Sequence, residues 1–168
     1  MMTEPTLTDR EEQPYMGHRT RATMQELGTA IPQGLDAVFA WLEKQGVTPA
    51  GAPFVRYHVI DMEAELDIEL GVPVAAAMPG DGDVAVGVLP AGRYAALVYT
   101  GIENGIPANA ALLDWGAANG LAWDTWATEK GDAFGARFES FLSDPDEEPD
   151  PARWQTEVAI RLAENDAR

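Results

Sequence analysis

One carboxylate, Glu157, lies in a stretch whose alternation could give it a chemical role. From Trp154 to Leu162, large apolar residues alternate with a second set that contains Glu157. Successive side chains of a β-strand point to opposite faces, so the pattern predicts a strand in which Glu157 faces away from the core. On an open face such a glutamate is solvated surface. At the base of an aromatic-lined cleft it would be a cation receptor or a general acid or base.

Other site chemistries are excluded by residue type. The chain has no cysteine, which rules out a thiol nucleophile, a disulfide framework and Cys-based zinc or iron–sulfur sites. His18 and His58 are the only histidines, too few for a His-rich metal site, and we expect neither to be catalytic. We therefore expect a protein without a metal or cofactor.

The charge balance points away from nucleic acid. The formal net charge is −17, with only 11 Lys and Arg residues, and affinity for phosphate comes from clusters of those residues. An acidic protein instead attracts cations. No apolar run reaches the roughly 18 residues of a membrane-spanning helix. The N-terminus has no basic residue followed by an apolar segment, so we expect a cytoplasmic protein without membrane contact.

The 168 residues fit one domain, and its first half predicts strand, helix, strand, strand. Residues 15–22 are a plausible first strand. Apolar residues recur at i, i+3, i+4 and i+7 from Leu35 to Leu42, which is typical of an amphipathic helix. Gly46 ends it. Two further strands are predicted over residues 54–60 and 63–70.

The second half predicts the same order. A strand over residues 93–100 leads to a helix that begins at Pro107 and ends at Gly120, because proline favours a first helical turn and glycine an end. Strands over 135–142 and 154–162 follow. The acidic, proline-interrupted segment between these two strands is predicted to be a loop.

This repetition predicts an α+β fold made of two βαββ units, residues 14–74 and 84–163. Placed side by side, the units would form antiparallel sheets with two helices on one face and a ligand groove on the other. Superposing their final strands makes Glu69 the counterpart of Glu157. Both glutamates are then expected to face the groove.

Five short motifs stand in a characteristic order: Pro53-Phe54-Val55-Arg56-Tyr57, Asp67-Ile68-Glu69-Leu70-Gly71-Val72-Pro73-Val74, Pro90-Ala91-Gly92-Arg93-Tyr94, Phe141-Leu142-Ser143-Asp144-Pro145 and Thr156-Glu157-Val158. With the βαββ repeat, they resemble the GyrI-like small-molecule-binding family, which includes the effector-binding domains of AraC-type and MerR-type multidrug regulators. The resemblance covers about residues 14–163, and we assign 1–13 and 164–168 to tails. No helix-turn-helix or basic segment precedes residue 14, so we expect a stand-alone member.

The resemblance implies a duplicated SHS2-type module whose cleft accepts lipophilic, often cationic, organic molecules. It also implies a glutamate on the last strand at the base of the cleft, a position that Glu157 matches. Phe141 stands where relatives commonly have tyrosine, which removes a hydroxyl group that could bind a ligand. Arg161 stands where relatives often have proline. It shares a strand face with Glu157, so we expect it to neutralise that carboxylate in part.

Three functions remain open at this stage. The chain could bind a lipophilic, cationic organic molecule, with aromatic rings and Glu157 as the receptor. It could instead be a hydrolase of cyclopropyl-type electrophiles, as one branch of the family is, with Glu157 as general acid or base. The third alternative is an acidic inhibitor of a basic protein partner, namely a DNA-handling enzyme such as gyrase. That role would use the run from Asp144 to Asp150 and the row Glu63, Glu65, Asp67 and Glu69.

The candidate site residues combine aromatic area with charge. Trp41, Trp115 and Trp154 fall in apolar rows and are assigned to the core. Trp123 and Trp126 lie in a loop-like stretch and are predicted to form a lid. Phe141 shares its strand face with Arg137 and Glu139. The predicted ligand-binding set is Glu157, Tyr57, Tyr94, Trp123, Trp126, Phe141, Glu69 and Arg161, with Glu157 also the catalytic residue if the chain is an enzyme.

Overall fold

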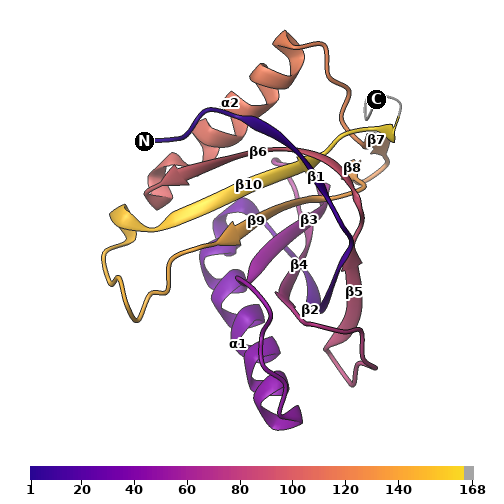
Figure 1. Cartoon of the computed structure of the whole chain (residues 1–168), viewed down its shortest axis with the longest axis vertical. Coiled ribbons are helices and arrows are strands. Elements are labelled where there is room, and N and C mark those ends of the chain that lie inside the picture. The colour runs from indigo at the N-terminus through magenta and orange to yellow at the C-terminus, as the bar shows by residue number, and fades with distance from the viewer. Residues whose placement is uncertain (165–168) are drawn as a thin grey trace.

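The computed structural model describes residues 1–164, and within them the chain forms ten β-strands and two α-helices (Figure 1). The helices are α1 (Leu27–Gln45) and α2 (Gly105–Ala118). No helix of this part of the chain is long and apolar enough to span a membrane. The strands are β1 (Thr6–Arg10), β2 (Gln13–Ala22), β3 (Phe54–Ile60), β4 (Leu66–Pro73), β5 (Ala85–Leu89), β6 (Gly92–Thr100), β7 (Thr125–Thr128), β8 (Gly131–Phe134), β9 (Arg137–Phe141) and β10 (Gln155–Arg161).

The strands form one antiparallel sheet in the order β1-β6-β10-β9-β3-β4-β2-β5, and the β7–β8 hairpin is attached to β3. The units β2-α1-β3-β4 and β6-α2-β9-β10 are the two predicted βαββ repeats, and they meet where β3 pairs with β9. The predicted α+β fold is confirmed. The strand before each unit pairs with the other unit, β1 with β6 and β5 with β2.

Strand pairing shows how the two halves correspond. Glu69 of β4 is aligned with Arg56 of β3, and Glu157 of β10 is aligned with Ser140 of β9. A phenylalanine stands two residues before Arg56, and another stands two residues before Ser140. Glu69 and Glu157 therefore occupy equivalent positions, as the superposition of the final strands predicts.

Helix α1 begins earlier than its apolar pattern predicts. The Thr23 side chain accepts a hydrogen bond from the backbone N–H of Glu26, and the Glu26 side chain accepts one from the backbone N–H of Thr23. This capping box starts a 3₁₀ turn that continues into α1. Pro32 lies in the second turn, and Gly46, with φ of 70°, ends the helix in the left-handed conformation that glycine tolerates best.

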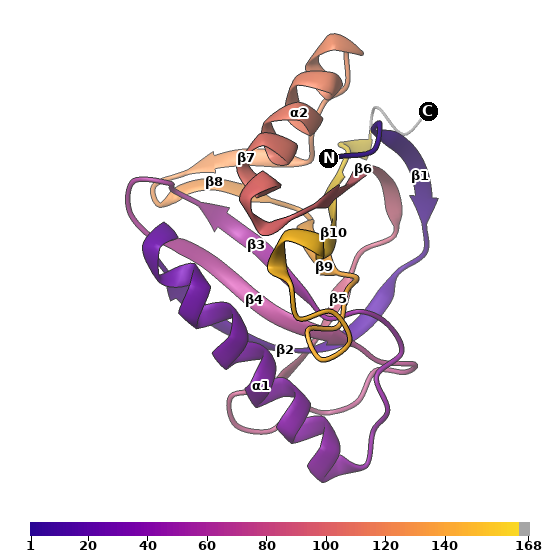
Figure 2. The ribbon, with the colours of Figure 1, turned by 90° about the vertical axis from the view of Figure 1, so that its left-hand side faces the viewer.

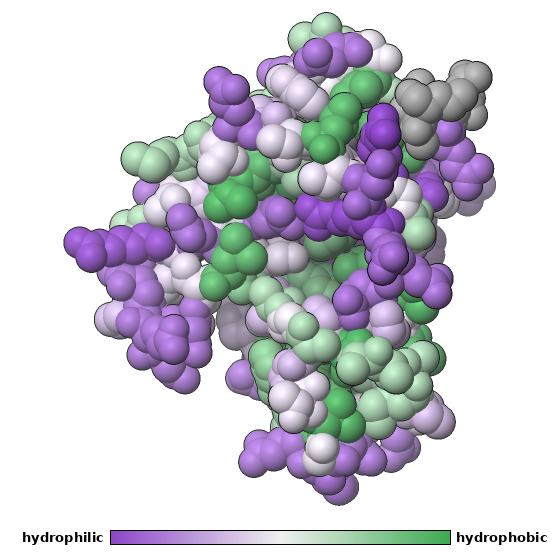
Figure 3. All heavy atoms as spheres, in the orientation of Figure 1, coloured by the Kyte–Doolittle hydropathy of each residue, from purple (hydrophilic) through white to green (hydrophobic). Residues whose placement is uncertain are grey.

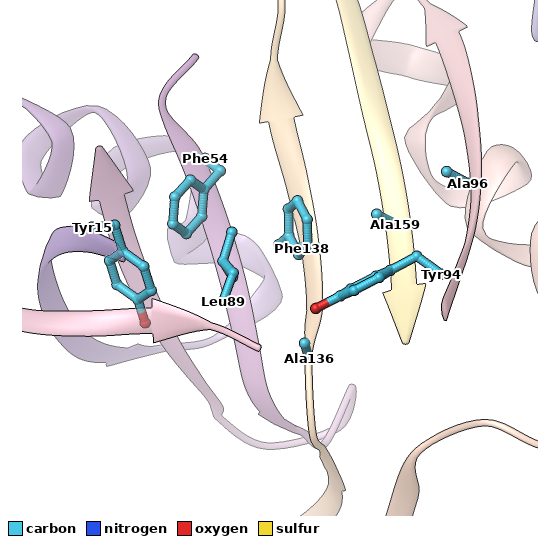
Figure 4. Packing of buried hydrophobic residues seen from close by; sticks show 8 residues of the cluster. All are labelled: Tyr15, Phe54, Leu89, Tyr94, Ala96, Ala136, Phe138 and Ala159. Carbon is cyan, nitrogen blue, oxygen red and sulfur yellow. The ribbon is translucent and has the colours of Figure 1, made fainter. Parts of the chain in front are cut away.

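The side chains of the sheet divide between two faces. Val55 is aligned with Glu139, and Glu139 with Val158, so these three residues share the face that packs against α1 and α2. We call this the helix face (Figure 2). The opposite, inner face carries a buried aromatic and aliphatic cluster (Figure 4). Its members are Tyr15, Phe54, Leu89, Tyr94, Ala96, Ala136, Phe138 and Ala159.

Several segments differ from the expectation. Residues 6–10, assigned to a tail, form the edge strand β1. The strand predicted over 63–70 begins at Leu66 because a turn occupies the residues before it. The loop-like stretch after α2 contains β7, which pairs with β8. Of the C-terminal tail, residues 165–168 lie outside the described residues.

Candidate functional site

A cleft of about 290 Å³ opens on the inner face. It is lined from both edges of the sheet, by Arg10 at the end of β1 and by Leu89 at the end of β5, which shows that the sheet curls around this face. Between them lie the rings of Phe54, Tyr94 and Phe138, and Glu157. Other residues that line it are Glu11, Gln13, Ala52, Pro73, Pro90, Ser140 and Leu142.

In this cleft Glu157 forms an ion pair with a side chain of the protein itself. Arg10 donates from Nη1 to Glu157 Oε1 at 3.1 Å. Its guanidinium carbon lies 5.4 Å from the centre of the Tyr94 ring and 6.0 Å from that of Phe138. These distances are within the range of cation–π attraction. A carboxylate with aromatic rings is the predicted receptor, but a side chain of the chain itself occupies it.

The expected neutralising cation, Arg161, has other partners. It donates from Nη1 to Asp124 Oδ2 at 2.9 Å and from Nε to the carbonyl oxygen of Ala91 at 3.0 Å. It therefore ties β10 to the segment before β7 and to the β5–β6 turn. The expectation that Arg161 partly neutralises Glu157 is not supported by a contact, because Arg161 is bonded to Asp124 and Ala91. Sequence reasoning missed Arg10 because the first 13 residues were assigned to a tail, although Thr6, Thr8 and Arg10 alternate as a strand requires.

Glu69, the counterpart of Glu157, is buried with a relative exposure of 7%. It accepts hydrogen bonds from the Tyr15 hydroxyl at 2.5 Å and is bonded to His58 Nε2 at 2.8 Å. Arg56 donates to the same Tyr15 oxygen at 3.0 Å. Burial alone raises the pKa of Glu69, but the hydrogen bonds from His58 and Tyr15 outweigh it and hold that pKa below its ordinary value. Glu69 is therefore satisfied inside the protein rather than open to a groove.

A third glutamate lies on the helix face. Glu139 is half-buried on the central strand β9, aligned with Val55 of β3 and Val158 of β10. The Tyr99 hydroxyl donates to Glu139 Oε1 at 2.8 Å, and Tyr57 lies near enough to the same carboxylate for its negative charge to act on the Tyr57 hydroxyl. Burial, and then the charge of Glu139, raise the pKa of both tyrosines, so they stay protonated donors.

This carboxylate joins two packed regions. Tyr57 belongs to the core under α1, and Tyr99 belongs to the core under α2. Phe141, two residues after Glu139 on the same face, also packs in the core under α1. In the described part of the chain, Glu139 takes part in no ion pair of 4.0 Å or less. Its negative charge is therefore met by the Tyr99 hydroxyl and not by a contacting cation.

The cation nearest to Glu139 along β9 is Arg137, and it is directed elsewhere. It donates from Nη2 to Asn109 Oδ1 of α2 at 2.9 Å, and its guanidinium carbon lies 4.8 Å from the centre of the Phe134 ring. Burial lowers the pKa of Arg137, while the charge of Glu139 acts in the opposite direction. Its Nε has no hydrogen-bond partner among the described residues. Arg137 thus holds α2 to the sheet beside the Glu139 cluster.

The structure separates the predicted site residues into groups. Glu157 and Tyr94 line the inner cleft. Arg161 and Glu69 lie on the same face of the sheet, with the partners described above. Tyr57 and Phe141 lie on the helix face with Glu139, so they do not line that cleft. The alternation Arg137-Phe138-Glu139-Ser140-Phe141 was the sequence signal for Glu139 and Phe138.

The two tryptophans predicted as a lid are not together. Trp123 packs against the core under α2, where it lies so close to Gly116 that no β-carbon would fit there. Trp126 lies on β7 with a relative exposure of 53%, aligned with Ala133 of β8. Among the described residues, no group of three or more His, Asp or Glu side chains is arranged to hold a metal ion.

Comparison with known proteins gives the context for these clusters. The model of the GyrI-like small molecule binding domain matches residues 3–163. The chain belongs to the GyrI-like family. The match includes β1, and with it Arg10, so the family domain extends beyond the predicted start at residue 14. No curated protein matches the sequence significantly.

Solved structures agree with this GyrI-like fold. The crystal structure of the EcmrR C-terminal domain is 18% identical, with a TM-score of 0.70 over 96% of this chain and 98% of that one. EcmrR bound to DNA gives 19% identity and a TM-score of 0.74, and this chain spans only 57% of that longer chain. A hydrolase from Listeria innocua is 14% identical, with a TM-score of 0.65 over 95% of this chain and 92% of that one. At these identities, the likeness shows the fold alone.

Proposed function

We propose that this GyrI-like chain binds a lipophilic organic cation on the helix face, with Glu139 as the charged receptor. The family is described by small-molecule binding, and the single observation that supports the site is the state of Glu139. It is a half-buried carboxylate that accepts a hydrogen bond from the Tyr99 hydroxyl and takes part in no ion pair within 4.0 Å in the described residues. By contrast, Glu157 has Arg10 and Glu69 has His58 as contacting partners.

The surroundings of Glu139 suit an apolar ligand with a positive charge. Rings of Tyr57 and Phe141 supply apolar area, and aromatic faces attract cations. A carboxylate in a partly desolvated position gains more from a cation than an exposed one does, because water screens it less. The net charge of −17 adds a long-range attraction for cations.

Tetraphenylphosphonium is a suitable probe, since a protein of this fold, SAV2435, has been solved bound to it. Calorimetry should show binding to the wild-type chain. Glu139→Gln should weaken the binding of tetraphenylphosphonium by roughly 10-fold or more, because the ligand loses a charged partner. The same substitution should change the binding of the neutral triphenylphosphine oxide much less. Glu157→Gln is the matched control on the opposite face. A larger loss of tetraphenylphosphonium affinity with Glu157→Gln would show that Glu157, the residue favoured by the sequence, is the receptor.

One observation also supports hydrolysis as a second candidate. A carboxylate in contact with the protonated Tyr99 hydroxyl combines a general base with a general acid in one cluster. If a cyclopropyl-type electrophile is hydrolysed here, Glu139→Gln and Tyr99→Phe should each lower kcat while Glu157→Gln should not. If the wild type shows no turnover, hydrolysis is eliminated and only the binding function remains.

One of the two acidic features that would support an inhibitor of a basic protein is not present as expected. Glu69 is buried and Asp67 is paired with Arg19, so the expected acidic row does not form one solvated face. The loop between β9 and β10 does project with hydrophilic side chains (Figure 3). A charge run of this kind is typical of a solvated surface, and we do not propose a protein partner for it.

A further inference from the structure

The inner cleft holds its own cation in the arrangement that a bound ligand would adopt. The guanidinium group of Arg10 is planar, contacts a carboxylate at 3.1 Å and lies over two aromatic rings. These are the elements by which proteins recognise organic cations. The side chains of Arg10 and Glu157 are 29% and 26% exposed. Because water screens an ion pair with this much exposure, the pair is weak. A competing cation could therefore replace Arg10 at little cost in free energy.

The strand that carries Arg10 lies at the edge of the sheet, and the residues before it continue its pairing with β6, since the Thr3 N–H donates to the Val98 carbonyl oxygen. β1 is an edge strand of five residues, four of which are exposed, and only one neighbour, β6, pairs with it. One further ion pair, between Asp9 and Arg93, joins β1 to β6, away from the cleft. Such edge segments open locally more easily than central strands do.

We propose that the inner cleft is a second binding site, for small aryl amidinium or guanidinium compounds, and that Arg10 is its internal competitor. The volume of about 290 Å³ suits one aromatic ring with a charged planar group rather than a large lipophile. Phe54, Tyr94 and Phe138 would hold the ring, and Glu157 would take the amidinium in place of Arg10. The site is on the opposite face of the sheet from Glu139 and does not depend on the function proposed above.

Internal competition has a measurable consequence. When a side chain occupies a site, the apparent affinity of a ligand falls by the fraction of molecules in which the site is free. Removing the competing side chain leaves the site free in all molecules, so the apparent affinity of the ligand rises. A guanidinium held by one partly exposed ion pair, a hydrogen bond to Thr8 Oγ1 at 3.2 Å and two rings would lower the apparent affinity of a ligand by a factor of roughly 10.

Benzamidine, with neutral benzamide as the reference compound, tests the proposal by calorimetry. All proteins carry Glu139→Gln, so that the helix-face cluster does not contribute. Arg10→Gln should raise benzamidine affinity about 10-fold, Arg10→Lys should give a smaller increase, and Glu157→Gln should abolish the preference for benzamidine over benzamide. Arg93→Gln is the matched control, because it removes a β1–β6 ion pair without freeing Glu157.

The possible results separate cleanly. An increase with Arg10→Gln and none with Arg93→Gln supports an internal competitor. An equal increase with both variants would show that loosening β1 is responsible, and an unchanged or lower affinity with Arg10→Gln would show that Arg10 is no competitor. Either of these results overturns the proposal. Retention of the preference for benzamidine in Glu157→Gln would overturn it as well.

Discussion

Glu69 and Glu157 occupy equivalent positions in β4 and β10, yet they are neutralised by unrelated partners. Glu69 is buried and bonded to His58 at 2.8 Å and to Tyr15, within its own half of the chain. Glu157 is paired at 3.1 Å with Arg10, whose strand crosses from the other half. The duplication therefore produced one internal polar network and one cleft.

Replacing Glu69 should affect stability more than binding. Glu69→Gln removes the charge from hydrogen bonds in a position of 7% exposure, so we expect the free energy of unfolding to fall by about 1.5–3 kcal/mol. Urea unfolding at neutral pH measures this. Glu65→Gln, at an exposed position directly before β4, is the control and should change little. A stable Glu69→Gln variant with weakened ligand binding would instead place Glu69 in a site.

The same network predicts a dependence of stability on pH. The pKa of Glu69 is lower in the folded protein than its ordinary value of 4.5. The folded state therefore binds this proton less readily than the unfolded chain, and the stabilisation is complete above pH 4.5 and lost as the pH falls through the folded pKa. The difference in unfolding free energy between wild type and Glu69→Gln should shrink from pH 7 to about pH 3. A difference that is constant or grows on acidification would contradict this assignment.

Gly17 should be required by the carboxylate opposite it. A β-carbon at Gly17 would lie 2.6 Å from Glu69 Oε2, so Gly17→Ala must displace a buried side chain whose Oε1 is bonded to Tyr15 and His58. We expect a loss of about 1–3 kcal/mol in unfolding free energy. Gly28→Ala, in α1 with open space around it, is the matched control and should stabilise the protein by up to about 1 kcal/mol. Equal effects of the two substitutions would show that Glu69 moves aside freely.

Much of the fold was predictable because it depends on local periodicity. The βαββ repeat, the two helices and the direction of Glu157 away from the helix-packed core all follow from alternation of period two or from helical spacing. β1 was missed because a short, polar edge strand carries little apolar signal, and its partner β6 is far away in sequence. The start of α1 was missed because a capping box, rather than an apolar residue, begins it.

The candidate sites divide in the same way. The sequence by itself determined that Glu69, Glu139 and Glu157 stand on strands, and that Glu157 faces away from the helix-packed core, since neighbouring residues dictate strand direction. Only the tertiary structure decided that Arg10 reaches Glu157, that His58 reaches Glu69 and that Tyr99 reaches Glu139. These partners are brought together by pairing between strands distant in the chain and by a sheet whose edges curl toward each other. The charge that each glutamate presents to a ligand depends on those long-range contacts, which no local pattern encodes.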